Sequence, residues 1–382
     1  MNNHDSAVNK PLTLANPTIV HIETGRHLYG GAQQVVYLLA GLAERGVNNI
    51  LIAPQDSAIS AEIAASGSAQ VHTTRHAGDL SLWFYREVKR LLTTIKPDIV
   101  HIHSRRGADT LGGLAAKAAG VPAVLSRRVD NLEHPLAIHF KYPLYEQVIG
   151  ISQAICDVIT QQGVNAGQVQ CVHSSVDTSR FDPSPEYKKT ARAALAKQFR
   201  IADDHTLLAV VAQLIPRKGH RQLLAVMPAI LAQFPNTSLL IFGQGPERDA
   251  IAAQIAELKL AQQVQLAGFC PNLDDDLPGI DLIVHPAEKE GLGVALLKAS
   301  AAGVAIVAGR AGGIPEIVQH GSNGLLFNPA RQSELQDCLE RLLSQPALRE
   351  QMGQTGIKIA QNQFSIAAMV DGNLSVYQKV LG

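Results

Sequence analysis

Four short glycine-containing turns follow apolar runs that have the length and composition of β-strands. In chain order they are Gly30-Gly31-Ala32, Gly243-Gln244-Gly245-Pro246, Glu290-Gly291-Leu292-Gly293 and Gly312-Gly313-Ile314-Pro315-Glu316. Glycine lets the backbone approach a ligand closely, and the start of a following helix offers free amide groups to phosphate. A single turn of this kind is weak support, because such glycines more often serve only the turn. Four of them in order predict a phosphate-binding site.

These turns are positioned by a regular alternation of apolar runs and longer stretches with helical periodicity. The first series of expected strands is 18–22, 49–53, 98–102, 123–125, 147–151 and 169–172. A polar segment, 174–187, has the composition of a linker, and a second series follows at 206–211, 238–242, 264–266, 281–284, 305–307 and 324–326. This alternation predicts two α/β units with parallel sheets, whose ligands bind beyond the carboxyl ends of the strands.

The composition is that of a well-packed globular protein. The chain has 382 residues, of which 46% are hydrophobic and 17% charged, which suits two domains of ordinary size. Thirty-three Lys+Arg balance 33 Asp+Glu, and this neutrality disfavours nucleic acid as a partner. The chain has no apolar run long enough to span a membrane, and its polar start does not have the pattern of a signal peptide. We therefore expect a cytoplasmic protein whose four isolated cysteines are inert thiols.

The segment 285–303 resembles the donor-site signature of glycosyltransferase family 4, a Glu-Gly-x-Gly turn that runs into a helix. Other matching pieces are Gly30-Gly31, His101-Ile102-His103, Lys218-Gly219, the turn 243–246 with Arg248, and the turn 312–316. The resemblance covers about residues 18–380 in the family's order. It implies a GT-B fold, in which two Rossmann-like doubly wound α/β domains face a central cleft. It also implies retaining transfer of a sugar from a sugar nucleotide to an acceptor.

The same resemblance sets the expected domain limits. Residues 1–17 are expected to be a flexible N-terminal segment, and 18–180 to form the acceptor-side domain. Residues 181–361 are expected to bind the nucleotide sugar. The last segment, 362–382, is expected to be a helix that crosses back onto the first domain.

The resemblance also implies roles for individual residues. Glu290 would bind hydroxyls of the transferred sugar, and Lys218, helped by Arg217, would neutralise the diphosphate. The backbone of Gly291, Leu292, Gly293 and Val294 would face the donor, together with the turns at Gly30, Gly31, Gly243 and Gly245. No nucleophile is evident, so the implied mechanism is same-face attack, in which the leaving phosphate deprotonates the acceptor hydroxyl.

Three positions depart from the family pattern. Lys298 replaces a second glutamate that binds ribose, Gln213 replaces a frequent arginine, and Arg128 stands near the place of a histidine close to the reacting sugar. Lys298 is either a helix-surface lysine or a donor contact, and we predict that it acts against the diphosphate. Arg128 and His103 are the other catalytic candidates, although a strand-end histidine is more often a structural, hydrogen-bonded residue.

We expect neither a cofactor nor a metal. The chain has no Asp-x-Asp motif, and no cysteine pair has the spacing of metal ligands. The nearest acidic run, Asp274-Asp275-Asp276, is better explained as a solvated loop or a helix start than as a metal site.

Basic residues are in excess between positions 75 and 141. Within this stretch Leu80, Phe84, Val88, Leu91 and Ile95 follow helical spacing, and Arg86, Lys89 and Arg90 occupy other faces. An ordinary amphipathic helix explains this pattern best. The alternative is an acceptor side suited to a phosphorylated or lipid-linked glycan, such as a lipopolysaccharide core, with peripheral contact to the inner face of the membrane.

Two other functions fit the same features. One is a sugar-nucleotide epimerase of GT-B type, which would act without an acceptor. The other is a non-catalytic nucleotide-sugar binding protein, which Lys298, Gln213 and Arg128 make conceivable. The sequence does not name the donor sugar, the nucleobase or the acceptor.

Overall fold

The computed structural model describes residues 16–75, 81–104 and 107–382. Residues 1–15 of the segment expected to be flexible lie outside this range. Leu80 of the expected helical stripe also lies outside it. In the described residues no helix combines the length and apolar character that crossing a bilayer requires.

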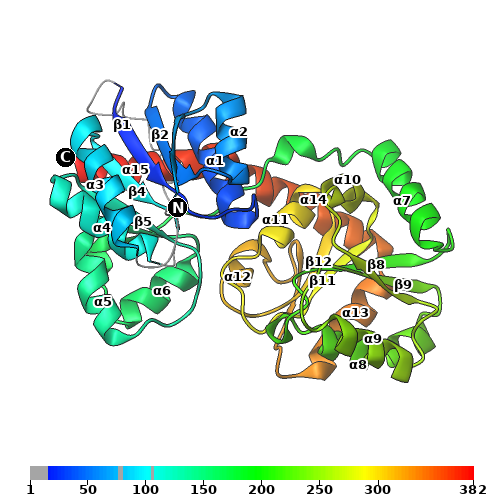
Figure 1. The fold of residues 1–382 in the computed structure, drawn as a ribbon. Coiled ribbons are helices and arrows are strands. Elements are labelled where there is room, and N and C mark those ends of the chain that lie inside the picture. Colours follow the sequence, from blue (N-terminus) through cyan, green and yellow to red (C-terminus); the bar gives the residue numbers. More distant parts are fainter. Residues whose placement is uncertain (1–15, 76–80, 105–106) are drawn as a thin grey trace, which may run out of the picture.

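The first domain is built on a seven-stranded parallel sheet (Figure 1). In spatial order its strands are β3 (Gln70–Thr74), β2 (Asn48–Pro54), β1 (Thr18–Ile22), β4 (Ile99–Ile102), β5 (Ala123–Arg127), β6 (Gln147–Gly150) and β7 (Val169–Cys171). Its helices are α1 (Gly30–Ala43), α2 (Ala58–Ser66), α3 (Leu82–Ile95), α4 (Ala108–Ala119), α5 (Pro135–Lys141) and α6 (Gln153–Gln161).

The second domain is built on a six-stranded parallel sheet. Its spatial order is β10 (Val264–Gly268), β9 (Thr237–Phe242), β8 (Thr206–Val211), β11 (Leu282–His285), β12 (Ala305–Gly309) and β13 (Gly324–Phe327). Its helices are α7 (Pro185–Phe199), α8 (His220–Gln233), α9 (Arg248–Glu257), α10 (Leu273–Asp276), α11 (Val294–Ala301), α12 (Ile314–Ile317), α13 (Gln332–Ser344) and α14 (Pro346–Gln363).

The apolar runs form strands that are buried on both faces, as parallel sheets covered by helices require. All six residues of β9 and all five of β12 are buried. Hydrophobic clusters lie on each side of the second sheet, one around Leu240 and Ile306 and the other around Leu239 and Val307. Serine side chains cap the starts of several helices, at Ser57, Ser81, Ser152, Ser184 and Ser365.

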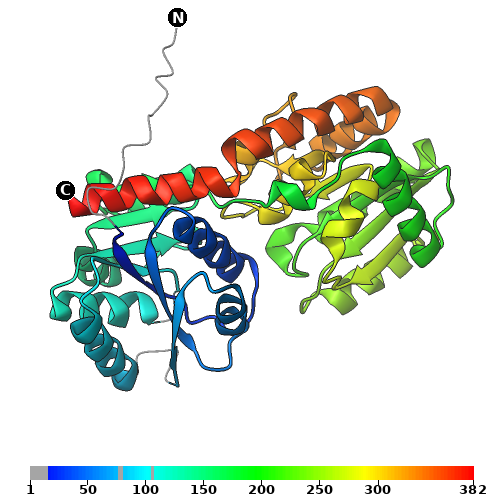
Figure 2. The same cartoon turned by 90° about the horizontal axis from the view of Figure 1, so that it is seen from above.

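The last helix, α15 (Ile366–Leu381), leaves the second domain after α14 and runs along the first domain (Figure 2). It packs on α1, where Val370 lies so close to Gly41 that no larger residue fits there. Arg45, which follows α1, donates to Asp371 over 2.8 Å, and the buried Tyr377 joins the core of the first domain. The chain therefore ties its two domains together at its end as well as at the linker.

The predicted fold class is confirmed, with two differences in the elements. Strand β3 was missed, because its sequence Gln-Val-His-Thr-Thr has a single apolar residue and lies at the sheet edge. Helix α7 begins at Pro185, inside the segment expected to be a linker, where Ser184 accepts a hydrogen bond from the amide of Tyr187. Polar composition therefore concealed a helix start.

Candidate active site

The carboxylate of Glu290 is the centre of a charged cluster on the second domain. Its Oε2 atom accepts a hydrogen bond from Nζ of Lys218 and lies 3.0 Å from Nε2 of His285. Glu290 belongs to the turn between β11 and α11, and Lys218 ends a single 3-10 turn after β8. Because β8 and β11 are neighbours in the sheet, their carboxyl ends bring together residues that are far apart in the chain.

The environment of Glu290 keeps it ionised. Burial alone would raise the pKa of its carboxyl, but the hydrogen bond with His285 and the charge of Lys218 outweigh burial and lower this pKa to about 2. An ionised carboxylate only accepts hydrogen bonds, so Glu290 is suited to binding hydroxyl groups. A group with so low a pKa is a poor general base near neutral pH.

Two glycines let the neighbouring turns close around this cluster. Gly219 has φ of +73°, and a Cβ there would collide with the carbonyl oxygen of Pro286. Gly312 has φ of +49° and would collide in the same way with the carbonyl of Glu290, which accepts from the amide of Gly313 over 3.1 Å. Larger residues are strained in these conformations, so both positions require glycine. The turn that carries Glu290 is thus held by its neighbours.

Helix α11 begins directly after this turn and has an open end. Its N-cap is Gly293, which offers no side-chain cap, and no acceptor within the described residues takes the amides of Val294 and Ala295. Free amides at the start of a helix attract anions. The side chain of Leu292 is buried in the core, so this residue presents only its backbone to the cleft.

Lys298, one turn further along α11, has an acidic partner inside the protein. Its Nζ lies 2.8 Å and 2.9 Å from the two carboxylate oxygens of Asp274 on α10. The sequence offered a surface lysine or a donor contact, and neither interpretation included this ion pair. The predicted contact between Lys298 and the diphosphate stays a prediction. To make it, the lysine would have to leave Asp274 or bind both groups at once.

The starts of α1 and α11 line a common cavity of about 370 Å³ between the two domains. The first domain contributes Tyr29, Gly30, Gln33 and Tyr37, and the second contributes Phe269, Asp274, Val294, Ala295 and Lys298. A ligand in this cavity would therefore meet two open helix ends.

The remaining second-domain candidates lie around the same edge of the sheet. Gly243 and Gly245 pack against the backbone carbonyls of the segment that follows β8, beside Gln213. Arg217 is half-exposed, and its Nη1 lies 3.9 Å from a carboxylate oxygen of Asp130 in the first domain. The structure therefore places Arg217 at the opening between the domains.

On the first domain, Arg128 lies beside the start of α1. Its Cδ would be 3.4 Å from a Cβ on Gly31, and its Nε is shielded from solvent without a hydrogen-bond partner. Its backbone carbonyl lies 3.2 Å from the place of a Cβ on Gly291, in the donor turn of the second domain. The structure thus brings Arg128 to the junction of both domains.

His103 does not reach the cleft as an accessible acid or base. It is 3% exposed, and its Nε2 lies 3.0 Å from Nδ1 of His21. His101, on the same strand, contacts Tyr377 and Ser126 instead. Burial holds the pKa of His103 well below its usual value, with a smaller contribution from nearby positive charge. Both strand histidines, including the catalytic candidate His103, are therefore enclosed in the core.

Direct contacts hold the donor turn against the first domain. Ser152 donates its hydroxyl to the carbonyl oxygen of Gly291 over 2.7 Å. Glu316 of the fourth glycine turn accepts the amides of Gln153 and Ala154, over 2.7 Å and 3.0 Å, at the start of α6. Its carboxylate also lies 2.7 Å from Nε2 of His173. The second domain thus supplies an acid to a helix start of the first, which stabilises the domain contact.

Two groups of side chains within the described residues lie close enough together to bind a metal ion. They are His21, His101 and His103 in the first domain, and Cys171, His173 and Glu316 at the domain contact. Hydrogen bonds within the protein already use part of each group. The expectation that no metal is needed stays a prediction.

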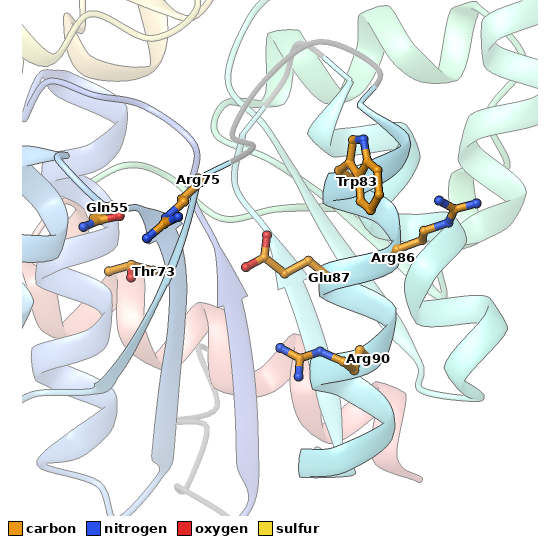
Figure 3. Close-up of a pocket in the computed structure, with 7 residues that line it drawn as sticks. All are labelled: Gln55, Thr73, Arg75, Trp83, Arg86, Glu87 and Arg90. Carbon is orange, nitrogen blue, oxygen red and sulfur yellow. The ribbon is translucent and has the colours of Figure 1, made fainter.

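A separate hollow of about 530 Å³ lies at the outer edge of the first domain (Figure 3). Thr73 of β3 and Arg75, which follows this strand, lie on one side. Trp83, Arg86 and Arg90 lie along α3 on the other. Trp83 is 62% exposed, and the guanidinium of Arg86 lies 5.4 Å from the centre of its ring. This hollow contains none of the predicted donor residues.

Two family models match the chain, one on each domain. Residues 29–180 match the model described as "Glycosyltransferase Family 4". Residues 191–359 match the model described as "Glycosyl transferases group 1". The chain belongs to this glycosyltransferase family. The resemblance inferred from the glycine turns is thereby confirmed.

Curated relatives agree with this membership. The chain is 32% identical over 202 residues to the GDP-mannose-dependent alpha-(1-6)-phosphatidylinositol monomannoside mannosyltransferase of Mycobacterium tuberculosis. That match covers 50% of this chain and 51% of the relative, so only about half the length of such relatives is matched. A putative glycosyltransferase of Bacillus subtilis, EpsD, is 26% identical over 78% of this chain and 80% of its own length.

Solved structures have the same fold. A glycosyltransferase from Rickettsia africae superposes with a TM-score of 0.85 at 17% identity, over 96% of this chain and 99% of the other. The structure of HepE from Anabaena, in complex with UDP and glucose, gives a TM-score of 0.80 at 20% identity, over 95% and 100%. At these identities the likeness shows the fold alone.

Sequence reasoning missed the acidic partners of two cations, Lys298 and Arg217. Asp274 lies 24 positions before Lys298, and Asp130 belongs to a different domain from Arg217. The acidic run around Asp274 was the available signal, but only the fold shows which lysine it faces.

Proposed function

We propose that this glycosyltransferase transfers a sugar from a sugar nucleotide to a glycan or lipid-linked acceptor with retention of configuration. The observation that carries the proposal is the ionised Glu290, held by Lys218 and His285 beside the open start of α11. This arrangement supplies an acceptor for sugar hydroxyls, a cation for phosphate and free amides at one edge of the second sheet.

The proposed roles follow from this chemistry. The donor lies between the starts of α1 and α11, with its diphosphate near Lys218 and Arg217 and its sugar at Glu290. Positive charge and fixed amides stabilise the leaving diphosphate as the sugar bond breaks. No carboxylate with a raised pKa is among the proposed donor contacts, which agrees with same-face attack, where the leaving phosphate takes the acceptor's proton.

We also propose that transfer needs neither a metal nor a cofactor. Support comes from the acids near the donor cavity, because Glu290 is paired with Lys218 and Asp274 with Lys298. Carboxylates already paired with cations are poorly placed to become ligands of a divalent ion. The cations and helix starts then replace the metal in neutralising the diphosphate.

The acceptor is proposed to enter from the first domain, near an anionic membrane surface. The exposed Leu82 and Trp83 and the arginines of the hollow in Figure 3 are an apolar and basic combination suited to lipid headgroups. A glycolipid such as a lipopolysaccharide core precursor fits this description, and nucleic acid does not fit the neutral chain. A vesicle co-sedimentation assay with anionic and zwitterionic lipids tests the membrane contact.

Turnover separates the proposal from its two alternatives. Thermal unfolding in the presence of a panel of sugar nucleotides identifies the donor, since a ligand of the native state raises its apparent stability. The chosen donor is then incubated with and without candidate acceptors. Acceptor-dependent release of nucleoside diphosphate supports transfer, whereas a change in the sugar without acceptor indicates an epimerase. Binding without either reaction indicates a non-catalytic protein.

A further inference from the structure

Arg128 is a partly buried cation that has no acidic partner among the described residues. No hydrogen bond or ion pair joins its guanidinium to any of the described residues, and its Nε is shielded from solvent. Glu23, whose charge favours the ionised form of Arg128, accepts hydrogen bonds from the hydroxyl of Ser104 and the amide of Gly25. A shielded donor that lacks a partner costs free energy, so the unpartnered Nε of Arg128 calls for an explanation.

The start of helix α1 lies directly beside this guanidinium. The helix has 14 residues, its N-cap Tyr29 offers no side-chain cap, and no described acceptor takes the amides of Gly30 and Gly31. Because Gly31 has no side chain, the Arg128 side chain can lie along the backbone there, 3.4 Å from where a Cβ would stand. A fork of guanidinium donors and an open helix end with free amides are thus adjacent, and both attract anions.

The other cations around the donor cavity already have partners. Lys218 is paired with Glu290, and Lys298 with Asp274. A negatively charged ligand must therefore break an ion pair to bind either lysine. It can bind Arg128 without breaking one. Since the backbone of Arg128 contacts Gly291 of the donor turn, a ligand between the domains passes close to it.

We propose that Arg128 is an anion-binding residue, which holds a negatively charged group of the donor against the start of α1. The proposal rests on the proposed function, because it takes the donor to be a sugar nucleotide. Two groups of such a donor have the required chemistry, the diphosphate and the carboxylate of an acidic sugar. Each presents oxygens that a guanidinium fork can bind in a bidentate way. Both domains then bind the donor. Arg128 binds and orients its negatively charged group and does not act as an acid or a base.

The test compares ligands that differ in their negative groups. Affinities of UDP or GDP, of the corresponding nucleotides of an uncharged sugar, and of UDP-glucuronate are measured by calorimetry for the wild type, Arg128→Gln and Arg128→Lys. We expect Arg128→Gln to weaken binding by about tenfold or more, and Arg128→Lys by less, because lysine keeps the charge and loses the fork. Equal losses for all ligands identify the diphosphate, and a loss confined to UDP-glucuronate identifies the carboxylate. Unchanged affinities for every ligand overturn the proposal.

Controls separate binding from folding. Lys117→Gln removes an exposed cation near the far end of α4 and should leave every affinity unchanged. Thermal unfolding without ligand should show Arg128→Gln at least as stable as the wild type, because the variant removes an unpartnered charge. A clear loss of stability in this variant, with binding retained, indicates a structural role and contradicts the proposal.

Pyrophosphate alone separates this proposal from the proposed function. An anion site at Arg128 predicts that pyrophosphate stabilises the wild type against heat more than Arg128→Gln, even if no sugar nucleotide binds. If no sugar nucleotide binds but pyrophosphate stabilises the wild type more than Arg128→Gln, the proposed function is refuted and the anion site is kept. Equal stabilisation of both proteins by pyrophosphate, with sugar nucleotides bound equally well, refutes the anion site and keeps the proposed function.

Discussion

The two sides of the cleft differ in whether their cations have acidic partners. On the second domain, Lys218 and Lys298 are each paired with a carboxylate in the ligand-free protein. On the first domain, Arg128 has no partner among the described residues, and the histidines beneath it are buried and neutral. The second side is therefore preorganised but neutralised, while the first side is open and positive. A donor that carries negative charge meets both kinds of site at once.

This difference suggests a division of labour during binding. A fixed ion pair orients Glu290 with little reorganisation, which favours recognition of sugar hydroxyls. The same pair reduces the attraction of Lys218 for phosphate until the carboxylate finds other donors. Arg128 and the start of α1 carry no such restriction.

The largest effect is expected from Glu290→Gln, which removes the charge and keeps the shape. Transfer should fall by about tenfold to a thousandfold, because a charge-assisted contact to the sugar is lost. Affinity for the nucleoside diphosphate should hold or rise, since Lys218 loses its carboxylate partner. Steady-state kinetics and calorimetry measure the two quantities.

The matched control is Glu288→Gln, which changes an exposed acid of the same segment and should leave both quantities unchanged. Because Glu290 is part of a buried ion-pair cluster, some loss of thermal stability accompanies its substitution, contrary to what a residue merely lining a cleft would show. Normal transfer by Glu290→Gln would remove this residue from the site.

The next effect concerns the partner of that carboxylate. Lys218→Ala should weaken both donor and nucleoside diphosphate by about tenfold, because a phosphate-binding lysine acts as a point charge. Product inhibition by the diphosphate reports the change, and Lys197→Ala on the exposed face of α7 is the control. Unchanged inhibition would show that Lys218 only holds Glu290, and the double variant with Arg217→Ala would then show whether Arg217 carries the charge.

A smaller effect is expected at Lys298. Replacing it by glutamate places two carboxylates together at Asp274 and near the donor cavity, so donor affinity should fall by a few fold. Asp274→Asn frees the lysine and should change donor affinity in the opposite direction, with a stronger dependence on salt. Measurements at two salt concentrations distinguish a phosphate contact from a lysine that only braces α10. Tighter donor binding by Lys298→Glu would refute the contact.

The sequence predicted the elements that repeat and missed those set by long-range partners. Continuous apolar runs predicted most strands within one or two residues of their ends, because parallel strands must be buried on both faces. The edge strand β3 lacks that requirement and was not found. The glycine turns were visible because close backbone approach excludes side chains, as at Gly219 and Gly312.

The charged partners of the site could not be predicted in the same way. A lysine carries no local sign of which carboxylate it will meet, so the pairing of Lys298 with Asp274 depends on how α10 and α11 pack. The burial of His103 likewise depends on β1, which places His21 against it, and His101 meets Tyr377 of α15. Residue type and spacing thus predicted which segments form the candidate site. Only the fold shows which of its charged residues have partners.

The smallest effect separates the two sides of the cleft by pH. Burial lowers the pKa of His21 to about 3, against a small opposing contribution from Asn49, and burial also holds those of His101 and His103 well below the usual value. Unfolding lets these groups bind protons, so their contribution to stability is complete above about pH 6.5 and is lost as the pH falls toward 3. Glu290 behaves differently, because its lowered pKa of about 2 makes its contribution fade only below about pH 4.5.

Between pH 7 and pH 5 the buried histidines of the first domain stay neutral in the folded protein and bind protons once it unfolds. Glu290 stays ionised in both states over most of this interval. Each fully buried histidine costs about 2 kcal/mol of unfolding free energy over this interval. His21→Gln should accordingly lose less stability from pH 7 to pH 5 than the wild type, whatever its stability at pH 7. His220 of the second domain, whose pKa burial lowers to about 4, titrates in both proteins and cancels. Chemical denaturation at the two pH values measures the difference, and the exposed His139→Gln is the control. Equal losses in all three proteins would mean that His21 is already protonated in the folded protein, which would contradict the lowered pKa.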